Sequence, residues 1–544
     1  MRAHRRRRLL AVLFTGALGT ALLIGLPAAA PAVSGSPPTH EATAAHRPPT
    51  CTPDPHAEKA SLRAMWIATV ANIDWPSKPG LSIEQQKSEL VSYLDMAQAQ
   101  GHNAVVLQVR PTADAFWPSD VEPWSKYLTG VAGQDPGYDP LAFAVAQAHA
   151  RNLELHAWFN PFRVSMDTDR GALAPDSPAR QHPDWVVSYG GQLYYNPGIP
   201  AVRELSEDAI MDAVTKYDID AVHFDDYFYP YPSGDTPFPD QKQYEKYGAG
   251  FDNVGDWRRD NINGFMQDLG DRIKEAKPWV KFGVSPFAVW RNKSSDPRGS
   301  DTTAGAETYD DLYADTRLWV KRDWIDYVAP QVYWARGFAP ADYEKVSSWW
   351  ADVVDGTDVA LYIGQATYKV GTSSQSPDWS EPDVLSRQLE FNTTLPEVKG
   401  NIYFSAKQVR ADRLGATTIL NQTWYSHPAL VPPMPWIDDR APKHPKQLHA
   451  RSGEAGVHLS WRAGDASTTS YAVYRLQRDD HGKVKGSDCR LADATHLLAT
   501  MRTTGAFQHF VDTTAEPGVR YTYVITGLDR TWNESPTTQR DVIG

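Results

Sequence analysis

The chain has 544 residues, a formal net charge of −12 and many aromatic residues, with 19 Trp, 25 Tyr and 17 Phe. This length allows two or three domains with a large core, and the negative charge argues against nucleic acid as a partner. Two cysteines in so long a chain exclude a disulfide scaffold. No Cys/His spacing indicates a zinc site, so we expect no metal ion and no cofactor.

The N-terminus is typical of a secretory signal. Arg5–Arg8 supply positive charge, an apolar run extends from Leu9 to Leu26, and Ala28–Ala30 form a small-residue cleavage zone. We expect a signal peptide over residues 1–30 and a secreted protein, extracellular or associated with the cell wall, with no stable membrane insertion after cleavage. Because the apolar run is close to spanning length, an uncleaved anchor is the alternative.

A spacer follows the signal. Residues 31–58 are rich in Ala, Pro, Ser, Thr and His, a composition that cannot bury a core, so we predict disorder there. Cys51 either pairs with Cys489 or both thiols are free, and the sequence leaves both possibilities open.

Strands alternate with amphipathic helices between residues 59 and 432. The predicted strands are Arg63–Val70, Ala104–Arg110, Leu153–Asn160, Ala221–Asp226, Lys281–Phe287, Tyr327–Tyr333, Val359–Ala366 and Asn401–Lys407. The predicted helices are Ile83–Gln100, Pro140–Asn152, Val202–Tyr217, Asp256–Ala276, Tyr309–Lys321, Asp342–Val354 and Pro382–Asn392. Eight strands separated by helices predict a parallel (β/α)8 barrel of the TIM type. An open doubly wound sheet is the main alternative, but no Gly-rich phosphate loop follows a strand.

The C-terminal part has a different character. After a Pro-rich linker over residues 433–445, short alternating segments at Gly456–Trp461, Tyr471–Arg475 and Tyr521–Thr526 are typical of sandwich strands. A strand ending in Trp, a Y-x-V-Y strand and a late Y-x-Y strand resemble a fibronectin type III domain. We expect a small all-β sandwich over residues 446–544 and few contacts across the linker, so that the barrel folds alone.

The segment Asp220–Pro230 is the most informative about function. Period-2 geometry places Val222 and Phe224 on one face, under helices, and Ala221, His223 and Asp225 on the other, toward the barrel interior. Barrel enzymes place their chemistry at the carboxyl ends of the strands. We therefore expect Asp225 and Asp226 at a catalytic mouth, with a helix-capping or loop role as the alternative.

Polar and aromatic side chains recur at the other strand ends. The residues expected to bind substrate are Asp74, Trp75, Arg110, Asp114, Trp158, Asn160, Arg163, His223, Tyr227, Trp290, Gln331, Tyr333, Trp334 and Gln365. An unpaired buried polar group costs about 1–3 kcal/mol, so these groups either pair among themselves or surround a polar ligand. A carbohydrate fits, because its hydroxyls need hydrogen-bonding partners and its ring faces need flat side chains.

Six segments carry a family resemblance. They are Arg63–Val70, Asn72–Pro76, Leu107–Pro111, Trp158–Pro161, His223–Pro230 and Ala329–Trp334. Together they resemble blocks of the glycosyl-hydrolase-like family 10, of the divisome-localised type, over about residues 61–424. The resemblance implies a (β/α)8 barrel and glycoside hydrolysis. Some family members act on peptidoglycan glycan strands, so we expect an amino-sugar polysaccharide as the partner.

The second catalytic carboxylate is the open question. Most glycosidases use two, and Asp225 is the best inward one. Asp226 can turn into the site, a loop acid (Asp74, Asp114 or Glu307) can serve, or a substrate N-acetyl group can act as the nucleophile while one Asp orients it. Because adjacent carboxylates repel, one pKa should rise, which suits a general acid. We favour the Asp225/Asp226 pair.

Two other functions fit parts of the sequence. A non-hydrolytic glycan-binding protein would use the same barrel and aromatic rim, and the missing second acid favours it. A metal-dependent polysaccharide deacetylase would need a His/Asp ligand cluster; His156 and His223 are available, but no H-x-x-x-H spacing is present.

Overall fold

The structure is a computed structural model that describes residues 53–479 and 491–544. The predicted signal peptide, most of the predicted spacer and both cysteines lie outside these residues. Within the described ranges, no helix has both the length and the apolar character that a membrane span requires.

Eight parallel strands close into a barrel in the order β1-β11-β10-β9-β8-β7-β3-β2. They are β1 (Leu62–Ile67), β2 (Ala104–Arg110), β3 (Glu154–Phe159), β7 (Ala221–Phe224), β8 (Lys281–Val284), β9 (Tyr327–Val328), β10 (Ala360–Gln365) and β11 (Val398–Tyr403). The predicted TIM-type barrel is confirmed, and the closed order excludes an open doubly wound sheet.

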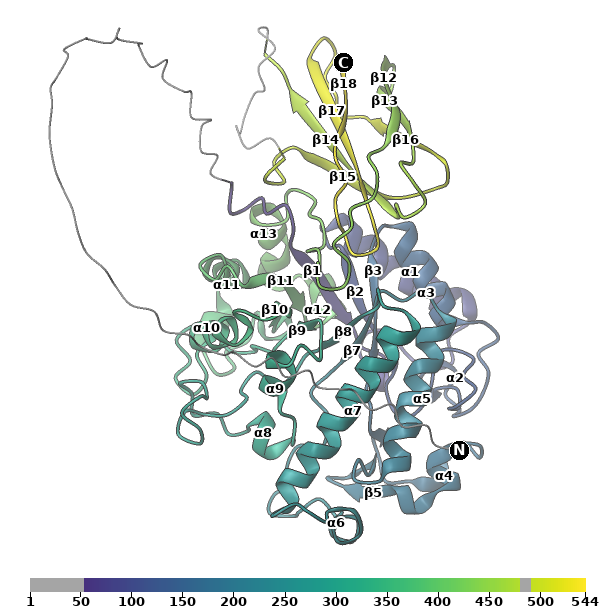
Figure 1. Cartoon of the computed structure of the whole chain (residues 1–544), viewed down its shortest axis with the longest axis vertical. Helices are drawn as coiled ribbons and strands as arrows, with labels where there is room; N and C mark the ends of the chain where they lie inside the picture. The colour runs from purple at the N-terminus through teal and green to yellow at the C-terminus, as the bar shows by residue number, and fades with distance from the viewer. Residues whose placement is uncertain (1–52, 480–490) are drawn as a thin grey trace, which may run out of the picture. The chain divides into compact units, whose positions relative to one another are not determined.

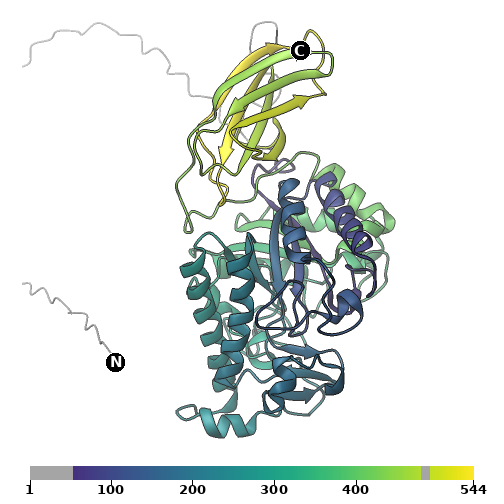
Figure 2. The ribbon, with the colours of Figure 1, turned by 90° about the vertical axis from the view of Figure 1, so that its right-hand side faces the viewer.

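Helices surround the barrel strands (Figure 1). They are α1 (Ile83–Ala99), α2 (Lys126–Thr129), α3 (Pro140–Ala150), α4 (Pro178–Gln181), α5 (Pro200–Lys216), α6 (Gln241–Tyr247), α7 (Val254–Ala276), α8 (Thr308–Asp311), α9 (Thr316–Lys321), α10 (Tyr343–Val354), α11 (Val384–Asn392), α12 (Ala406–Ala411) and α13 (Ala416–Thr423). The two long helices α5 and α7 run side by side on one flank of the barrel (Figure 2).

The alternation along β7 decides which side chains reach the barrel interior. Val222 and Phe224 are buried in the layer between strands and helices, where Phe224 stacks on Phe265 of α7. Ala221 belongs to the interior cluster together with Trp66 and Trp158. The predicted parity is confirmed, and it places the residue after Phe224 at the barrel mouth.

A small antiparallel sheet is inserted after β3, in the order β4-β6-β5. It consists of β4 (Arg163–Ser165), β5 (Val186–Tyr189) and β6 (Gln192–Tyr195). Phe162 O accepts a hydrogen bond from Tyr195 N at 2.8 Å, which ties this sheet to the chain leaving β3. The insertion therefore brings Arg163 and Gln192 to the carboxyl end of β3.

The C-terminal part forms two antiparallel sheets, β12-β13-β16 and β15-β14-β17-β18. Their strands are β12 (Lys446–Gly453), β13 (Gly456–Arg462), β14 (Ser470–Gln477), β15 (Leu497–Arg502), β16 (Phe507–Asp512), β17 (Arg520–Leu528) and β18 (Thr538–Ile543). A barrel followed by a small all-β domain is confirmed; that the domain is of the fibronectin type III kind stays a prediction.

The amino ends of the barrel strands contact the C-terminal sheets. Trp532 Nε1 donates a hydrogen bond to Glu154 Oε1 at 2.7 Å, and Lys281 forms an ion pair with the same carboxylate at 2.5 Å. A continuous apolar cluster includes Leu62 of the barrel and Tyr474 of β14. Because the C-terminal sheets bury the amino ends of the barrel strands, a ligand site is expected at the opposite, carboxyl ends of the strands.

Candidate functional site

A cavity of about 380 Å³ lies at the carboxyl ends of the barrel strands. Its lining residues are Trp66, Ala68, Val70, Ile73, Gln108, Trp158, Arg163, Met166, Gln192, Asp225, Asp226, Tyr227, Ser285, Gln331, Tyr333, Tyr368 and Phe404. Asp225 and Asp226 are the two carboxylates in this lining. The structure thus brings together both residues predicted to be catalytic with five of those predicted to bind substrate, which are Trp158, Arg163, Tyr227, Gln331 and Tyr333.

Asp225 is held by neutral N–H donors. Asn160 Nδ2 donates to both of its oxygens, at 3.1 and 3.2 Å, Trp158 Nε1 donates at 3.2 Å, and the backbone N–H of Tyr227 donates at 3.2 Å. Burial raises the pKa of Asp225 to about 6, with the neighbouring charge of Asp226 adding to the rise and Arg163 opposing it. Asp225 can therefore exchange a proton near neutral pH.

Asp226 has different partners. It accepts a hydrogen bond from the Tyr231 hydroxyl and another from Gln331 Nε2, at 3.0 Å for the latter. Gln331 is itself fixed by donating to Ser285 O at 2.9 Å. Burial raises the pKa of Asp226, while the two donors oppose the rise. The adjacent carboxylates thus sit in distinct surroundings, the arrangement that separates an acid from a charged partner.

Arg110 lies behind Asn160 and does not line the cavity. Its guanidinium donates a hydrogen bond to Asn160 O. Its Nε and Nη2 donate to the two oxygens of the Glu122 carboxylate, at 2.6 Å each. Asn160 in turn accepts from Arg163 N at 2.8 Å and donates to Asp225. Glu122 is not among the residues predicted from the sequence. The signal that could have pointed to it is Arg110, because an arginine on a buried strand needs a carboxylate partner.

His223 lies one layer beneath the cavity floor. Its Nε2 accepts from Trp66 Nε1 at 3.0 Å, so Nδ1 carries the proton and donates to the Tyr327 hydroxyl at 2.9 Å. Burial holds the pKa of His223 well below its usual value, so the ring is neutral. His223 therefore orients Trp66, a lining residue, and does not itself line the cavity.

The three loop acids lie outside the cavity. Asp74 accepts from Ser405 Oγ at 2.7 Å and Ala68 N at 2.8 Å, linking the loops that follow the first and last strands. Asp114 lines a separate cavity of about 30 Å³, where burial raises its pKa to about 7. Glu307 accepts from Asn292 N at 3.1 Å and Ser295 Oγ at 2.7 Å within its own loop.

Four further residues predicted to bind substrate also lie outside the cavity lining. Trp75 donates to Gln86 O of α1 at 2.8 Å, and Trp290 donates to Asp315, the residue before α9, at 3.0 Å. Trp334 packs edge-on against Phe287. Gln365 donates to the hydroxyl of Tyr343 at 2.8 Å.

An apolar wall faces the aspartates. Tyr333 packs against Tyr368 and Phe404, and all three line the cavity with Trp66. Ile73, Met166 and Tyr368 are large apolar side chains that remain 36–39% exposed at the rim. One side of the cavity is thus charged and hydrogen-bonding, and the other offers flat apolar surface, which suits a sugar ring.

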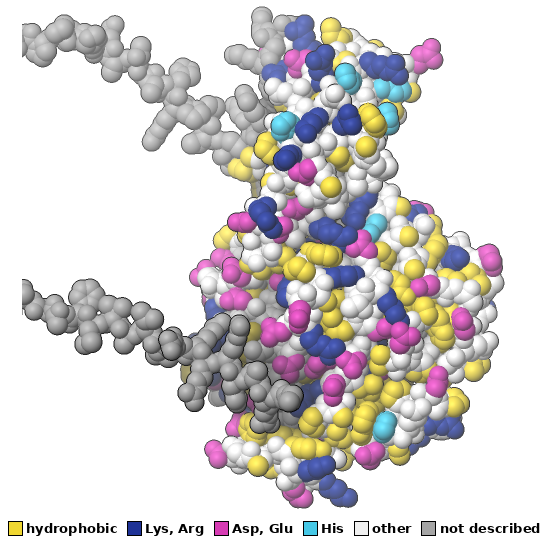
Figure 3. Space-filling view, turned by 45° about the vertical axis from the view of Figure 1, so that its right-hand side comes forward, with side chains coloured by type: hydrophobic (Ala, Val, Ile, Leu, Met, Phe, Trp, Pro, Cys, Tyr) yellow, Lys and Arg dark blue, Asp and Glu magenta, His cyan; other side chains and the backbone are white. Residues whose placement is uncertain are grey.

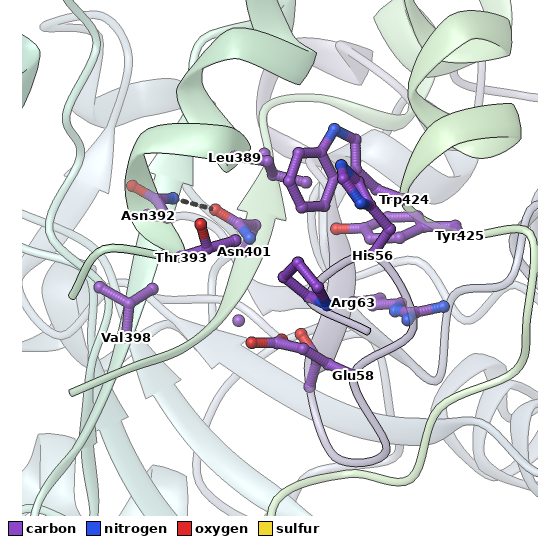
Figure 4. Close-up of a pocket in the computed structure, with 13 residues that line it drawn as sticks. His56, Glu58, Arg63, Leu389, Asn392, Thr393, Val398, Asn401, Trp424 and Tyr425 are labelled. Atoms are coloured by element: carbon purple, nitrogen blue, oxygen red, sulfur yellow. Dashed lines mark hydrogen bonds between the residues drawn. The ribbon is translucent and has the colours of Figure 1, made fainter. Parts of the chain in front are cut away.

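A second cavity, drawn in Figure 4, is too small for a sugar. It measures about 30 Å³, room for about one or two waters, and Glu58, Arg63, Trp424 and Tyr425 line it.

No group of three or more His, Cys, Asp or Glu side chains in the described ranges is arranged to hold a metal ion. The surface in Figure 3 carries acidic and basic side chains interspersed over the barrel.

Comparison with known proteins agrees with this geometry. The model of the family Glycosyl hydrolase-like 10 matches residues 61–381. Glycosyl hydrolase YngK of Bacillus subtilis (strain 168) is 50% identical over 486 residues, 88% of this chain and 92% of the relative. Glycosyl hydrolase DigH of Escherichia coli (strain K12) is 41% identical over 407 residues, 71% of this chain and 91% of the relative.

Among solved structures, the glycoside hydrolase domain of PgaB (BpsB) from Bordetella bronchiseptica matches 67% of this chain and 99% of that one. Its TM-score of 0.44 and 14% identity make it too distant to bear on function. The family model and the two long alignments at 50% and 41% identity are decisive. The chain belongs to the glycosyl hydrolase-like 10 family.

Proposed function

We propose that this protein is a secreted glycosidase that cleaves amino-sugar glycan strands, with the glycan of peptidoglycan as the favoured substrate. The observation that carries the proposal is the buried Asp225/Asp226 pair, which supplies both carboxylates of the cavity from adjacent positions. Membership of a family whose relatives are named glycosyl hydrolases supports the reaction class. The apolar wall opposite the pair supports a sugar substrate.

Adjacent carboxylates fit a reaction in which the substrate supplies its own nucleophile. The carbonyl oxygen of a substrate N-acetyl group attacks C1, the bond from C1 to the leaving oxygen breaks, and Asp225 gives that oxygen a proton. Asp226, ionised between Tyr231 and Gln331, accepts from the acetamido N–H and balances the developing positive charge. Water then attacks C1, the bond from C1 to the acetamido oxygen breaks so that the N-acetyl group is restored, and the proton of the water passes to Asp225.

This mechanism removes the need for a distant second acid. Asp74, Asp114 and Glu307 are engaged elsewhere, as their partners show. A direct displacement by one aspartate would instead need the other carboxyl group about 5 Å away across the glycosidic bond.

The test compares glycan strands that differ in one group. Strands with N-acetylated sugars and no stem peptides should be cleaved, with new reducing ends appearing over time. Chemically de-N-acetylated strands of equal length should not be cleaved. Equal rates on both would exclude assistance by the substrate, and cleavage of neutral α-glucans would overturn the amino-sugar proposal.

A non-hydrolytic glycan-binding protein is the second candidate function. The observation that favours it is that all three candidate loop acids, Asp74, Asp114 and Glu307, have partners outside the cavity. The same assay separates the two functions, since a binding protein sediments with the glycan and releases no reducing ends.

A further inference from the structure

One face of the antiparallel sheet β12-β13-β16 is turned to solvent. Leu459 and Trp461 of β13 are buried in the apolar core of the C-terminal sheets. His458, Ser460 and Arg462 alternate with them, so their side chains point to the opposite side of the sheet. We call this side the outer face.

The register of the strands aligns further side chains with these three. They are Lys446 and Phe507 beside Arg462, His449 and His509 beside Ser460, and Arg451 and Val511 beside His458. The spacing of strands and of alternate residues gives this grid a size of about 10 Å by 14 Å. It holds arginine, lysine and histidine side chains and no Asp or Glu, in a chain whose net charge is −12.

The protein does not neutralise the cations of the outer face. Lys446, Arg451 and Arg462 are exposed, and none of them forms an ion pair with a described Asp or Glu. The guanidinium carbon of Arg462 lies 4.9 Å from the centroid of the Phe507 ring. Their positive charge is therefore available to a ligand.

The acids nearest in sequence lie off the outer face. Asp512, the one acid within β12, β13 and β16, is buried and accepts hydrogen bonds from the Tyr523 hydroxyl at 2.6 Å and Arg475 Nη1 at 2.8 Å. Glu454 lies in the turn between β12 and β13, beyond the aligned residues. Strand alternation thus separates the acid from the cations.

The spacing of the cations favours an extended polyanion. Lys446 and Arg462 lie at one end of the grid and Arg451 at the other, about 14 Å away along the strands. A single small anion cannot reach both ends. A phosphodiester carries its charge and two acceptor oxygens within the polymer backbone, so a chain of phosphodiesters can lie along a flat face and accept from the histidine and serine side chains between the cations.

Membranes and nucleic acids fit this face less well. Membrane binding needs continuous apolar surface, whereas His509 separates Phe507 from Val511. Single-stranded nucleic acid stacks its bases on aromatic rings, and the ring of Phe507 is already in contact with Arg462. A polymer without bases or acyl chains matches the face better.

We infer that the outer face of β12-β13-β16 binds a linear polymer of phosphodiester-linked polyols. The acidic remainder of the chain repels such a polymer and restricts it to this face. The inference goes beyond the proposed glycosidase and does not depend on it, because no residue of the outer face lines the cavity that holds Asp225 and Asp226.

The experiment measures binding of the whole protein to fluorescently labelled poly(glycerol phosphate) by anisotropy. For wild type, raising the salt from about 50 to about 200 mM should weaken binding about 10- to 20-fold, because three neutralised phosphates give a slope of about −2 in log K against log salt. Lys446→Gln/Arg451→Gln/Arg462→Gln should bind at least about 10-fold more weakly at low salt and lose most of the salt dependence.

A matched variant controls for net charge. Lys242→Gln/Arg322→Gln/Arg413→Gln removes the same charge from exposed positions of the barrel and should bind as wild type does. Both triple variants should melt close to wild type, because the substituted side chains are exposed.

Two further polymers of equal length test the requirement for phosphodiesters. Uncharged polyglycerol should not bind to wild type, and polyglutamate should bind more weakly than poly(glycerol phosphate). This comparison uses wild type alone, so it stands even if a variant does not fold.

Several results would overturn the inference. Equal binding by wild type and the outer-face variant would place the polymer elsewhere, and equal losses in both triple variants would show that only net charge matters. Polyglutamate that binds as tightly as poly(glycerol phosphate) would remove the preference for phosphodiesters. Tighter binding to phosphatidylglycerol vesicles or to oligothymidylate would assign the face to a membrane or to nucleic acid. Glycan cleavage is not measured, so failure of the proposed function is seen separately.

Discussion

At the scale of single residues, the site depends on two adjacent carboxylates with different neighbours. Asp225 accepts hydrogen bonds only from N–H groups, those of Asn160, Trp158 and Tyr227. Asp226 accepts hydrogen bonds from the Tyr231 hydroxyl and from Gln331 Nε2. Burial and mutual repulsion raise the pKa of Asp225 to about 6. Two identical side chains thus have different surroundings, which the proposed division into an acid and a charged partner requires.

The rate of cleavage should depend on pH in a bell shape. Asp225 must be protonated to act as the acid, so activity should fall as pH rises through about 6. Asp226 must be ionised, so activity should also fall at low pH, beginning above the usual range of an aspartate because burial raises its pKa. The two apparent values belong to the pair. A profile of kcat/KM against pH that stays flat across pH 6 would contradict this assignment.

The repulsion within the pair is itself measurable. Asp226→Asn removes a negative charge beside Asp225 and should lower the pKa of Asp225. Carboxyl carbon NMR during a pH titration reads this directly and needs no activity. Asp120→Asn, at an exposed side chain paired with Lys216, is the matched control and should leave the Asp225 titration in place. An unchanged titration in Asp226→Asn would argue that the two groups are uncoupled.

At the scale of elements, a buried ion pair joins Arg110, at the end of β2, to Glu122 in the loop that follows β2. Glu122→Gln leaves the Arg110 guanidinium without its anion and should lower the free energy of unfolding by about 3–5 kcal/mol. The exposed pair of Arg336 and Glu344 offers a control, since Glu344→Gln should cost about 0–1 kcal/mol. Urea denaturation measures the free energy of unfolding of both variants. Equal losses would show that burial does not make the ion pair of Arg110 and Glu122 more important for stability than the exposed pair.

The elements also show what the sequence could and could not predict. All eight strands were expected from their apolar runs, but β9 comprises only Tyr327–Val328, because Pro330 lacks the N–H that a longer ladder needs. The predicted helix over Tyr309–Lys321 is split into α8 and α9, with Tyr313 at positive φ between them. The strands of the inserted sheet have three or four residues each, too few for a periodic signal.

The candidate site was predictable to a similar degree. Strand parity placed Asp225, Trp158 and Asn160 at the mouth, because alternation is set by the backbone. It could not separate cavity tryptophans from packed ones. Trp75 and Trp290 follow strands as predicted, yet their rings donate hydrogen bonds to Gln86 O of α1 and to Asp315, the residue before α9. Lining residues such as Tyr368 and Gln192 come from loops and the inserted sheet, whose paths no periodicity reveals.

At the scale of the whole molecule, the C-terminal sheets and the barrel share buried polar contacts. Trp532→Phe removes one N–H from Glu154, which retains Lys281 and His156, and should cost about 1–3 kcal/mol of unfolding free energy. Cleavage at the other end of the strands should be unaffected once the protein is folded. A melting curve and an activity assay on the same sample check both statements.

Removal of the C-terminal domain tests the predicted boundary. A chain ending near Pro433 keeps every residue of the cavity lining and should retain activity on short soluble glycans. It should melt at a lower temperature than the full chain, because Glu154 loses its hydrogen bond from Trp532 and the buried ion pair of Glu154 with Lys281 becomes exposed to solvent. Aggregation of this chain would show that the barrel and the sheets form one folding unit.

The most direct test of the central claim is reducing-end release from N-acetylated glycan strands by wild type and by Asp225→Asn. Wild type should release reducing ends steadily, whereas Asp225→Asn should release them at least about 100-fold more slowly, because it cannot give a proton to the leaving oxygen. A melting temperature close to wild type would show that the fold is intact. Near-normal release by Asp225→Asn would contradict the account.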